Sequence, residues 1–211
     1  MKTDEFINTL ASDLRPQHSL HWVLLCGLLC GALLAALAFA VFLGFRSDIL
    51  SALTSIRFLF KFVVTLTLAI TATYATLNLA RPDSAGNHRS WSLLLTPVIL
   101  VGAVAVELMV LPSRSWEDNL VGHNATHCLT VIPLLSAGPL LCIFAALRRG
   151  APSEPGLTGA VAGLAASGIG ATFYAANCTD DSPLFVVAWY PLAVLIVAGV
   201  AYFIGARALR W

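Results

Sequence analysis

Two cysteines, Cys128 and Cys178, each stand where a long apolar stretch of the sequence meets a short polar one. Two thiols on the oxidising side of a membrane can be joined as a disulfide, and such a pair can report on oxidants. A bridge here would close a loop of about 50 residues and would contribute roughly 4 kcal/mol to stability in the chain-entropy description. The alternatives are a permanent structural disulfide and two thiols that never meet. We favour a sensing role for the pair.

Imidazole and carboxylate groups near these cysteines offer a second chemistry. Thiolate, imidazole and carboxylate ligands together suit a soft or borderline divalent cation. Their spacing matches none of the usual zinc signatures, so metal capture is an alternative to a disulfide. The candidate ligands are His123, His127, Cys128, Cys178 and Asp181, with Asp180 beside them. We expect no resident cofactor.

Lys61 and Glu107 are charged residues that lie well inside apolar stretches. An unpaired charge at the centre of a membrane costs about 2.5–3.5 kcal/mol or more. Both residues lie a few positions in from the same end of their stretches, so their depths match. We therefore predict an ion pair between them. The alternative is that Lys61 extends its ammonium outward to the membrane surface, alongside Arg57.

The elements that must position these residues are six long apolar stretches. Only 11% of the residues are charged and 58% are hydrophobic, whereas a soluble domain carries about 25% charged residues. About 20 helical residues cross the hydrocarbon core of a bilayer, and these stretches are too long for the strands of a barrel. We therefore predict an all-α bundle of six transmembrane helices. The expected helices span residues 22–45, 56–79, 91–111, 126–147, 157–176 and 184–206.

Small residues recur at every fourth position in two of these stretches. Such stripes allow neighbouring helices to approach closely. We interpret both as packing surfaces. They consist of Gly159, Gly163, Ser167 and Ala171 in the fifth stretch, and of Gly27, Gly31 and Ala35 in the first.

Lys and Arg are unevenly distributed between the two ends of the expected helices. Short cytoplasmic loops carry an excess of these residues. The end with the excess also holds both termini, so we place both termini in the cytoplasm and Cys128 and Cys178 near the opposite face. The basic residues at the terminal end are Lys2, Arg15, Arg81, Arg89, Arg148, Arg149, Arg207 and Arg210, against Arg46 and Arg114 in the opposite loops.

We expect residues 1–21 to form a cytoplasmic segment that precedes a six-helix transmembrane domain, residues 22–211. Thr3 suits the cap of a short amphipathic helix that Pro16 would end. This helix would be too short to be stable alone, and its acidic polar face disfavours binding to anionic lipid. Docking of its apolar side in a groove of a cytoplasmic protein fits better. The apolar side consists of Phe6, Ile7, Leu10 and Leu14.

Several classes of function are disfavoured. The sequence has no GxSxG, no HExxH and no glycine-rich phosphate loop, so we expect that it is not an enzyme. It has no basic run and a net charge of +1, so we expect no direct nucleic-acid binding. The alternatives that we keep are a small membrane thiol oxidoreductase, which would need a quinone site or a CxxC pair, and a small transporter, which would need more buried polar groups.

Several pieces of the sequence, spread over nearly its whole length, point to one family by their order and spacing. They are residues 1–7 (MKTDEFI), 148–152 (RRGAP), 178–185 (CTDDSPLF) and 209–211 (LRW), together with Phe60-Lys61, Glu107, Gly122-His123, Cys128 and Trp189-Tyr190. In these pieces the chain resembles the NrsF family of bacterial inner-membrane anti-sigma factors, which hold an extracytoplasmic-function sigma factor inactive.

The resemblance implies that residues 1–21 bind the sigma factor in the cytoplasm and release it under stress. It also implies that Cys128 and Cys178 take part in sensing from the periplasm. On this basis we expect a multi-pass protein of the bacterial inner membrane whose partners are an extracytoplasmic-function sigma factor and the lipid bilayer. The inducer would be an oxidant or a heavy metal.

Overall fold

The computed structural model describes residues 19–81 and 88–210, and every regular element in these two ranges is a helix. The predicted all-α class is therefore confirmed. The elements are α2 (Leu20–Phe42), α3 (Ile49–Ala52), α4 (Ile56–Leu79), the 3-10 helix η2 (His88–Leu94), α5 (Leu95–Val110), the 3-10 helix η3 (Ser113–Ser115), α6 (Trp116–Val121), α7 (Ala125–Leu147), α8 (Pro155–Ala175) and α9 (Pro183–Ala208).

Six helical segments in the described ranges are long and apolar enough to cross a membrane, as predicted. They are α2, α4, α7, α8, α9 and the segment Trp91–Val110, which includes the end of η2 and all of α5. The bounds differ from the predicted ones by at most three residues. The expected amphipathic helix, with Phe6, Ile7, Leu10 and Leu14, lies outside the described residues.

The outside of the bundle is covered by apolar side chains. Leu33, Ile70 and Phe203 are each more than 60% exposed, and Met109 on α5 is 86% exposed. Water-soluble proteins rarely expose apolar area on this scale, but in a bilayer these side chains contact acyl chains. The surface is therefore compatible with a multi-pass membrane protein.

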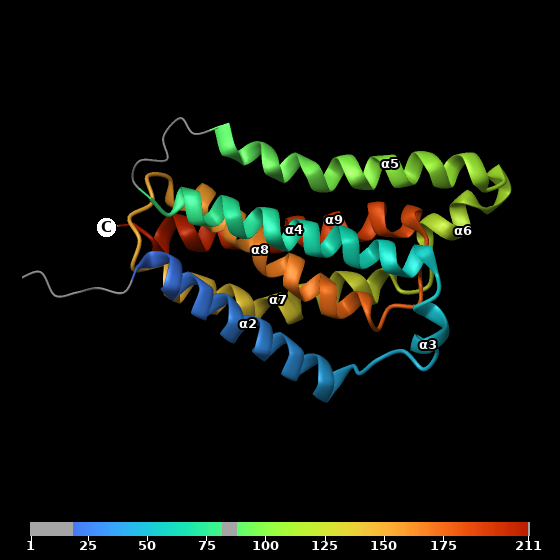
Figure 1. Cartoon of the computed structure of the whole chain (residues 1–211), viewed down its shortest axis with the longest axis horizontal. Coiled ribbons are helices and arrows are strands. Elements are labelled where there is room, and N and C mark those ends of the chain that lie inside the picture. The colour runs from blue at the N-terminus through green and yellow to red at the C-terminus, as the bar shows by residue number, and fades with distance from the viewer. Residues whose placement is uncertain (1–18, 82–87, 211) are drawn as a thin grey trace, which may run out of the picture.

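Helix α8 occupies the centre of the bundle and packs against α4, α7 and α9 (Figure 1). Glycines make this possible on three of its sides. A Cβ atom added at Gly163 would lie 2.9 Å from the Cα of Ala198 on α9, and one at Gly168 would lie 2.7 Å from the backbone nitrogen of Ala69 on α4. One at Gly170 would lie 2.9 Å from the backbone nitrogen of Ser136 on α7. The predicted stripe is confirmed at Gly159 and Gly163, which both approach α9 closely, whereas Gly168 and Gly170 lie outside that stripe.

Helices α2 and α5 lie on opposite sides of this centre (Figure 1). Helix α2 packs chiefly against α7, and α5 contacts α4 and α9. On α2 the close approach occurs at Gly27 and Gly31, where an added Cβ would meet Cys142 and Pro139 of α7. Helices α3 and α6 lie at one end of the bundle, which we call the α3–α6 end, and the C-terminus lies at the other (Figure 1).

The glycine packing of α8 gives a prediction about stability. Gly163→Val should lower the free energy of unfolding in detergent micelles by about 1–3 kcal/mol, because the new methyl groups would overlap α9. The matched control is Gly199→Val on α9, where an added Cβ has no neighbour within 4 Å. Equal unfolding midpoints for the two variants would show that this close approach is unimportant.

Candidate functional site

The ammonium group of Lys61 is fully buried near the α3–α6 end of the bundle. Its Nζ lies 2.6 Å from Oδ1 of Asp181 and donates a hydrogen bond of 2.8 Å to the carbonyl oxygen of Cys178. Both acceptors belong to residues 176–182, the segment between α8 and α9 that we call the Cys178 loop. A charge that is removed from water needs a partner and hydrogen bonds, and this loop supplies both to Lys61.

Arg46, which lies between α2 and α3, joins the same loop. Its guanidinium contacts both carboxylate oxygens of Asp181, at 3.1 and 3.0 Å, and donates to the carbonyl of Cys178 at 3.3 Å. It also pairs with Asp48 through two hydrogen bonds of 2.6 and 2.7 Å, and these hold the pKa of the Asp48 carboxyl below its usual value. The backbone N–H of Arg46 donates to Ala176 at 3.3 Å. The positive charges of Lys61 and Arg46 are thus balanced by the carboxylates of Asp48 and Asp181. These contacts connect α2, α4 and the Cys178 loop.

Asp180 fixes the same loop to the start of α7. Its Oδ2 accepts backbone N–H groups of His123 and Asn124 at 2.9 and 2.8 Å, and the side-chain amide of Asn124 at 2.9 Å. Burial opposes ionisation of this carboxyl, but the N–H donors outweigh it and the pKa of Asp180 is lowered. Gly122, with a φ of 59°, allows this approach, since an added Cβ would lie 2.9 Å from Asp180 Oδ2.

Cys128 and Cys178 lie in one buried apolar cluster at this end, with Tyr174, Phe185 and Tyr190. Both are free thiols, 0% and 2% exposed. Burial raises the pKa of the Cys178 thiol, while nearby Lys61 and a hydrogen bond from Tyr174 act in the opposite direction. A protonated, buried thiol is a poor nucleophile. An oxidant therefore needs an opening of this cluster before it can reach Cys178.

The predicted ion pair between Lys61 and Glu107 is wrong in its partners, although both residues are buried as expected. Lys61 pairs with Asp181, and Glu107 pairs with Arg57 at 3.1 Å. Ser182 also donates to Oε1 of Glu107, at 3.3 Å. Matching helix depth made Glu107 the obvious partner in sequence, but the Cys178 loop folds inward and brings a carboxylate closer.

The predicted metal ligands are not gathered into a site. Within residues 19–81 and 88–210, no group of three or more His, Cys, Asp or Glu side chains could hold a metal ion. The carboxylate of Asp181 is already used by Lys61 and Arg46. The side chain of His123 is 95% exposed, with Nδ1 3.7 Å from Asp180, and the ring of His127 packs near Tyr174 instead.

Sequence reasoning missed the part that Arg46, Asp48 and Asn124 play in the site. In the sequence, Arg46 contributes only to the count of basic residues in the loops opposite the termini. One signal was available, because an Arg and an Asp two positions apart beside a membrane helix can form a local pair. Nothing in the sequence indicates that the pair extends to Asp181, since that contact depends on how distant helix ends meet.

Comparison with known proteins agrees with the resemblance found in the sequence. The chain belongs to the NrsF family, described as negative regulators of sigma F, and the family pattern matches residues 10–211. The predicted family membership is thereby confirmed.

Two curated relatives align over their whole length. The chain is 30% identical over 223 aligned positions to the anti-sigma-F factor NrsF of Caulobacter vibrioides (strain NA1000 / CB15N). It is also 30% identical over 216 positions to the probable anti-sigma-F factor NrsF of Azospira oryzae (strain ATCC BAA-33 / DSM 13638 / PS). Each alignment covers 100% of both chains. No solved structure matches the chain.

The charge network gives a prediction about stability. Asp181→Asn should destabilise the protein in detergent by about 3–5 kcal/mol, because it leaves the Lys61 ammonium buried without its counter-charge. Adding Lys61→Met to this variant should restore part of the loss, since the uncompensated charge is then gone. Thermal and denaturant unfolding of the single and double variants form the measurement.

Asp118→Asn on α6 is the matched control, because Asp118 is exposed and its carboxylate forms no ion pair within the described ranges. Its unfolding midpoint should equal that of the unaltered protein. If Asp181→Asn behaves like Asp118→Asn, the buried pair does not stabilise the bundle.

Proposed function

We propose that this protein is an inner-membrane anti-sigma factor that holds an extracytoplasmic-function sigma factor through residues 1–21 and releases it under stress. The observation that carries the proposal is the full-length similarity to two anti-sigma-F factors. The six apolar helices support a multi-pass location in the membrane. The apolar side of the N-terminal segment, with Phe6, Ile7, Leu10 and Leu14, supplies the contact with the sigma factor.

The excess of Arg and Lys near both termini supports placing that end of the bundle in the cytoplasm. The α3–α6 end, with Cys128 and Cys178, then faces the periplasm, where thiols meet oxidants and heavy metals. The buried state of both thiols suits a resting protein, since it keeps them unreactive until the apolar cluster opens. Stress acts by favouring a second arrangement of the bundle in which the two thiols are modified.

The contacts of the Cys178 loop supply a route from these thiols to the sigma-binding segment. Lys61 and Arg46 both bind the carbonyl of Cys178, and the N–H of Arg46 binds Ala176. Arg46 follows the end of α2, and residues 1–18 precede the other end of α2 in the sequence. A change of packing at Cys178 therefore displaces α2, and α2 carries the N-terminal segment with it.

The first experiment tests the contact with the sigma factor. The full-length protein, purified from its native membrane in mild detergent, should bring down an extracytoplasmic-function sigma factor. Phe6→Asp with Leu10→Asp should abolish this, because two charges cannot enter an apolar groove. The control is Asp4→Asn with Glu5→Gln on the polar side, which should keep the partner. Retention of the sigma factor by the Phe6 and Leu10 variant would overturn the binding role of residues 1–21.

The second experiment tests sensing. Replacing Cys128 and Cys178 together by Ser should leave the sigma-dependent genes repressed when cells meet an oxidant or a heavy metal, as measured by transcript levels. The control replaces Cys26 by Ser, a cysteine of α2 remote from the Cys178 loop, and should respond like the unaltered protein. A normal stress response in the Cys128 and Cys178 variant would refute sensing through this pair, whereas the sigma-binding proposal would stand.

A further inference from the structure

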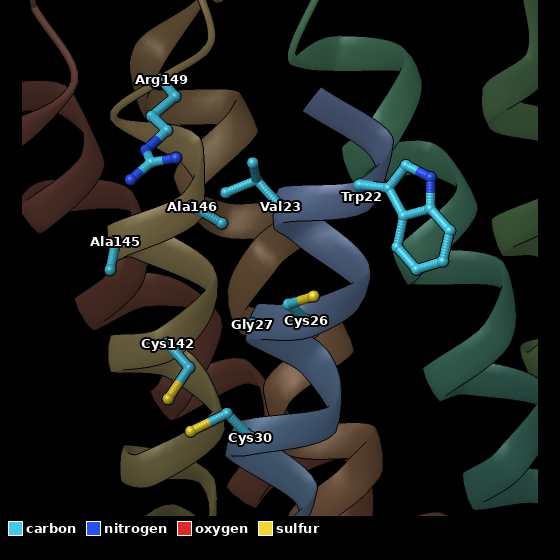
Figure 2. A pocket seen from close by; sticks show the side chains of 9 residues that line it. All are labelled: Trp22, Val23, Cys26, Gly27, Cys30, Cys142, Ala145, Ala146 and Arg149. Atoms are coloured by element: carbon cyan, nitrogen blue, oxygen red, sulfur yellow. The ribbon is translucent and has the colours of Figure 1, made fainter. Parts of the chain in front are cut away.

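The three cysteines that the proposed function does not use lie together between α2 and α7. Cys26, Cys30 and Cys142 line a cavity of about 720 Å³, with Trp22 and Arg149 at one end of it (Figure 2). Cys26 and Cys30 are exposed on the outside of the bundle, and Cys142 is half-buried. In a bilayer this cavity faces acyl chains rather than water, so the reagents that reach it are those that dissolve in lipid.

Two of the three thiols face each other across the cavity. Figure 2 shows the sulfur atoms of Cys30 and Cys142 pointing toward one another, whereas the sulfur of Cys26 points away from Cys142. Both thiols line the same cavity. Two sulfur atoms that point toward one another across a pair of packed helices have the arrangement from which a disulfide can form.

The backbones of α2 and α7 also come close enough around this pair. An added Cβ at Gly27 would lie 2.9 Å from the carbonyl oxygen of Cys142, and one at Gly31 would lie 2.5 Å from the Cα of Pro139. Cys30 lies between these two glycines in the sequence. The glycine stripe of α2, which the sequence marked as a packing surface, therefore also holds Cys30 against Cys142. A disulfide requires Cα atoms about 4.4–6.8 Å apart, and helices in backbone contact reach this range.

We propose that Cys30 and Cys142 form a second redox site, which a lipid-soluble organic hydroperoxide oxidises to a disulfide. The lipid-exposed thiol of Cys30 attacks the outer peroxide oxygen, and its proton passes to the departing oxygen; the O–O bond breaks, an alcohol leaves and a sulfenic acid forms at Cys30. The other thiol attacks that sulfur, the S–O bond breaks and water leaves. The two thiols together lose two electrons and two protons, and the hydroperoxide is reduced to an alcohol and water.

The bridge would change how one helix is held in the bundle. Helix α2 packs chiefly against α7 and exposes much of its surface, with Leu29, Leu33 and Leu37 all more than half exposed. A covalent link to α7 removes its freedom to separate from the rest of the bundle. Cys30 and Cys142 lie within α2 and α7 and not in the Cys178 loop, so this site reacts with oxidants inside the lipid phase and does not depend on the proposed function.

The test uses the full-length protein with Cys128 and Cys178 replaced by Ser, reconstituted in phospholipid nanodiscs. Three thiols then remain. Treatment with cumene hydroperoxide should leave one free thiol, Cys26, as counted by maleimide labelling and mass spectrometry. Dithiothreitol should restore all three, because a disulfide is reducible whereas sulfinic and sulfonic acids are not. Peptide mapping of the unaltered protein under non-reducing conditions should show the same Cys30–Cys142 bridge.

Matched variants distinguish the Cys30–Cys142 pair from the neighbouring Cys26. Adding Cys26→Ser should leave bridge formation unchanged, whereas adding Cys30→Ser should abolish it and leave both remaining thiols free. Three persisting thiols after peroxide treatment would overturn the proposal. A bridge that involves Cys26, or a loss of thiols that dithiothreitol does not reverse, would also overturn it.

Discussion

The burial of the Lys61 ammonium is the constraint on which the candidate site depends. A fully buried cation in an apolar bundle is tolerated only with a counter-charge and hydrogen-bond acceptors around it. The Cys178 loop meets this requirement by turning a carbonyl and the Asp181 carboxylate toward α4. Because Arg46 shares the same two acceptors, the loop also fixes the end of α2. One buried charge thus determines how three helices meet.

Close glycine packing provides the rigid frame for this arrangement. Helix α8 is buried on most of its circumference and contacts α4, α7 and α9 through glycines on different sides. The Cys178 loop extends directly from this helix, so its position is set by the most tightly packed element of the described structure. Helices α2 and α5, by contrast, lie at the periphery and expose much of their apolar surface. The site therefore joins a fixed centre to a more weakly held helix.

Much of the fold could be predicted from the sequence, because few backbone structures can cross a lipid bilayer. The six spans follow from apolar length, and the stripe at Gly159 and Gly163 follows from its four-residue spacing. The partner of Lys61 could not be predicted in the same way. Helix depth favoured Glu107, but the true partner, Asp181, depends on the inward course of a loop that no periodic pattern describes. The candidate metal ligands are likewise not gathered among the described residues, where Asp181 is paired with two cations.

The acceptor that residue 178 offers to Lys61 and Arg46 is its main-chain carbonyl, not its sulfur. The sulfur of residue 178 is therefore the reactive atom, and the main-chain carbonyl is the atom that makes the structural contacts. Any side chain that fits the apolar cluster leaves the contacts of this carbonyl with Lys61 and Arg46 intact. Replacing the thiol therefore does not disrupt the loop. Conversely, a disulfide formed at the sulfur adds no charge near the cations, so it can act on them only by displacing the main chain. A signal that begins with such a disulfide is mechanical from its first step.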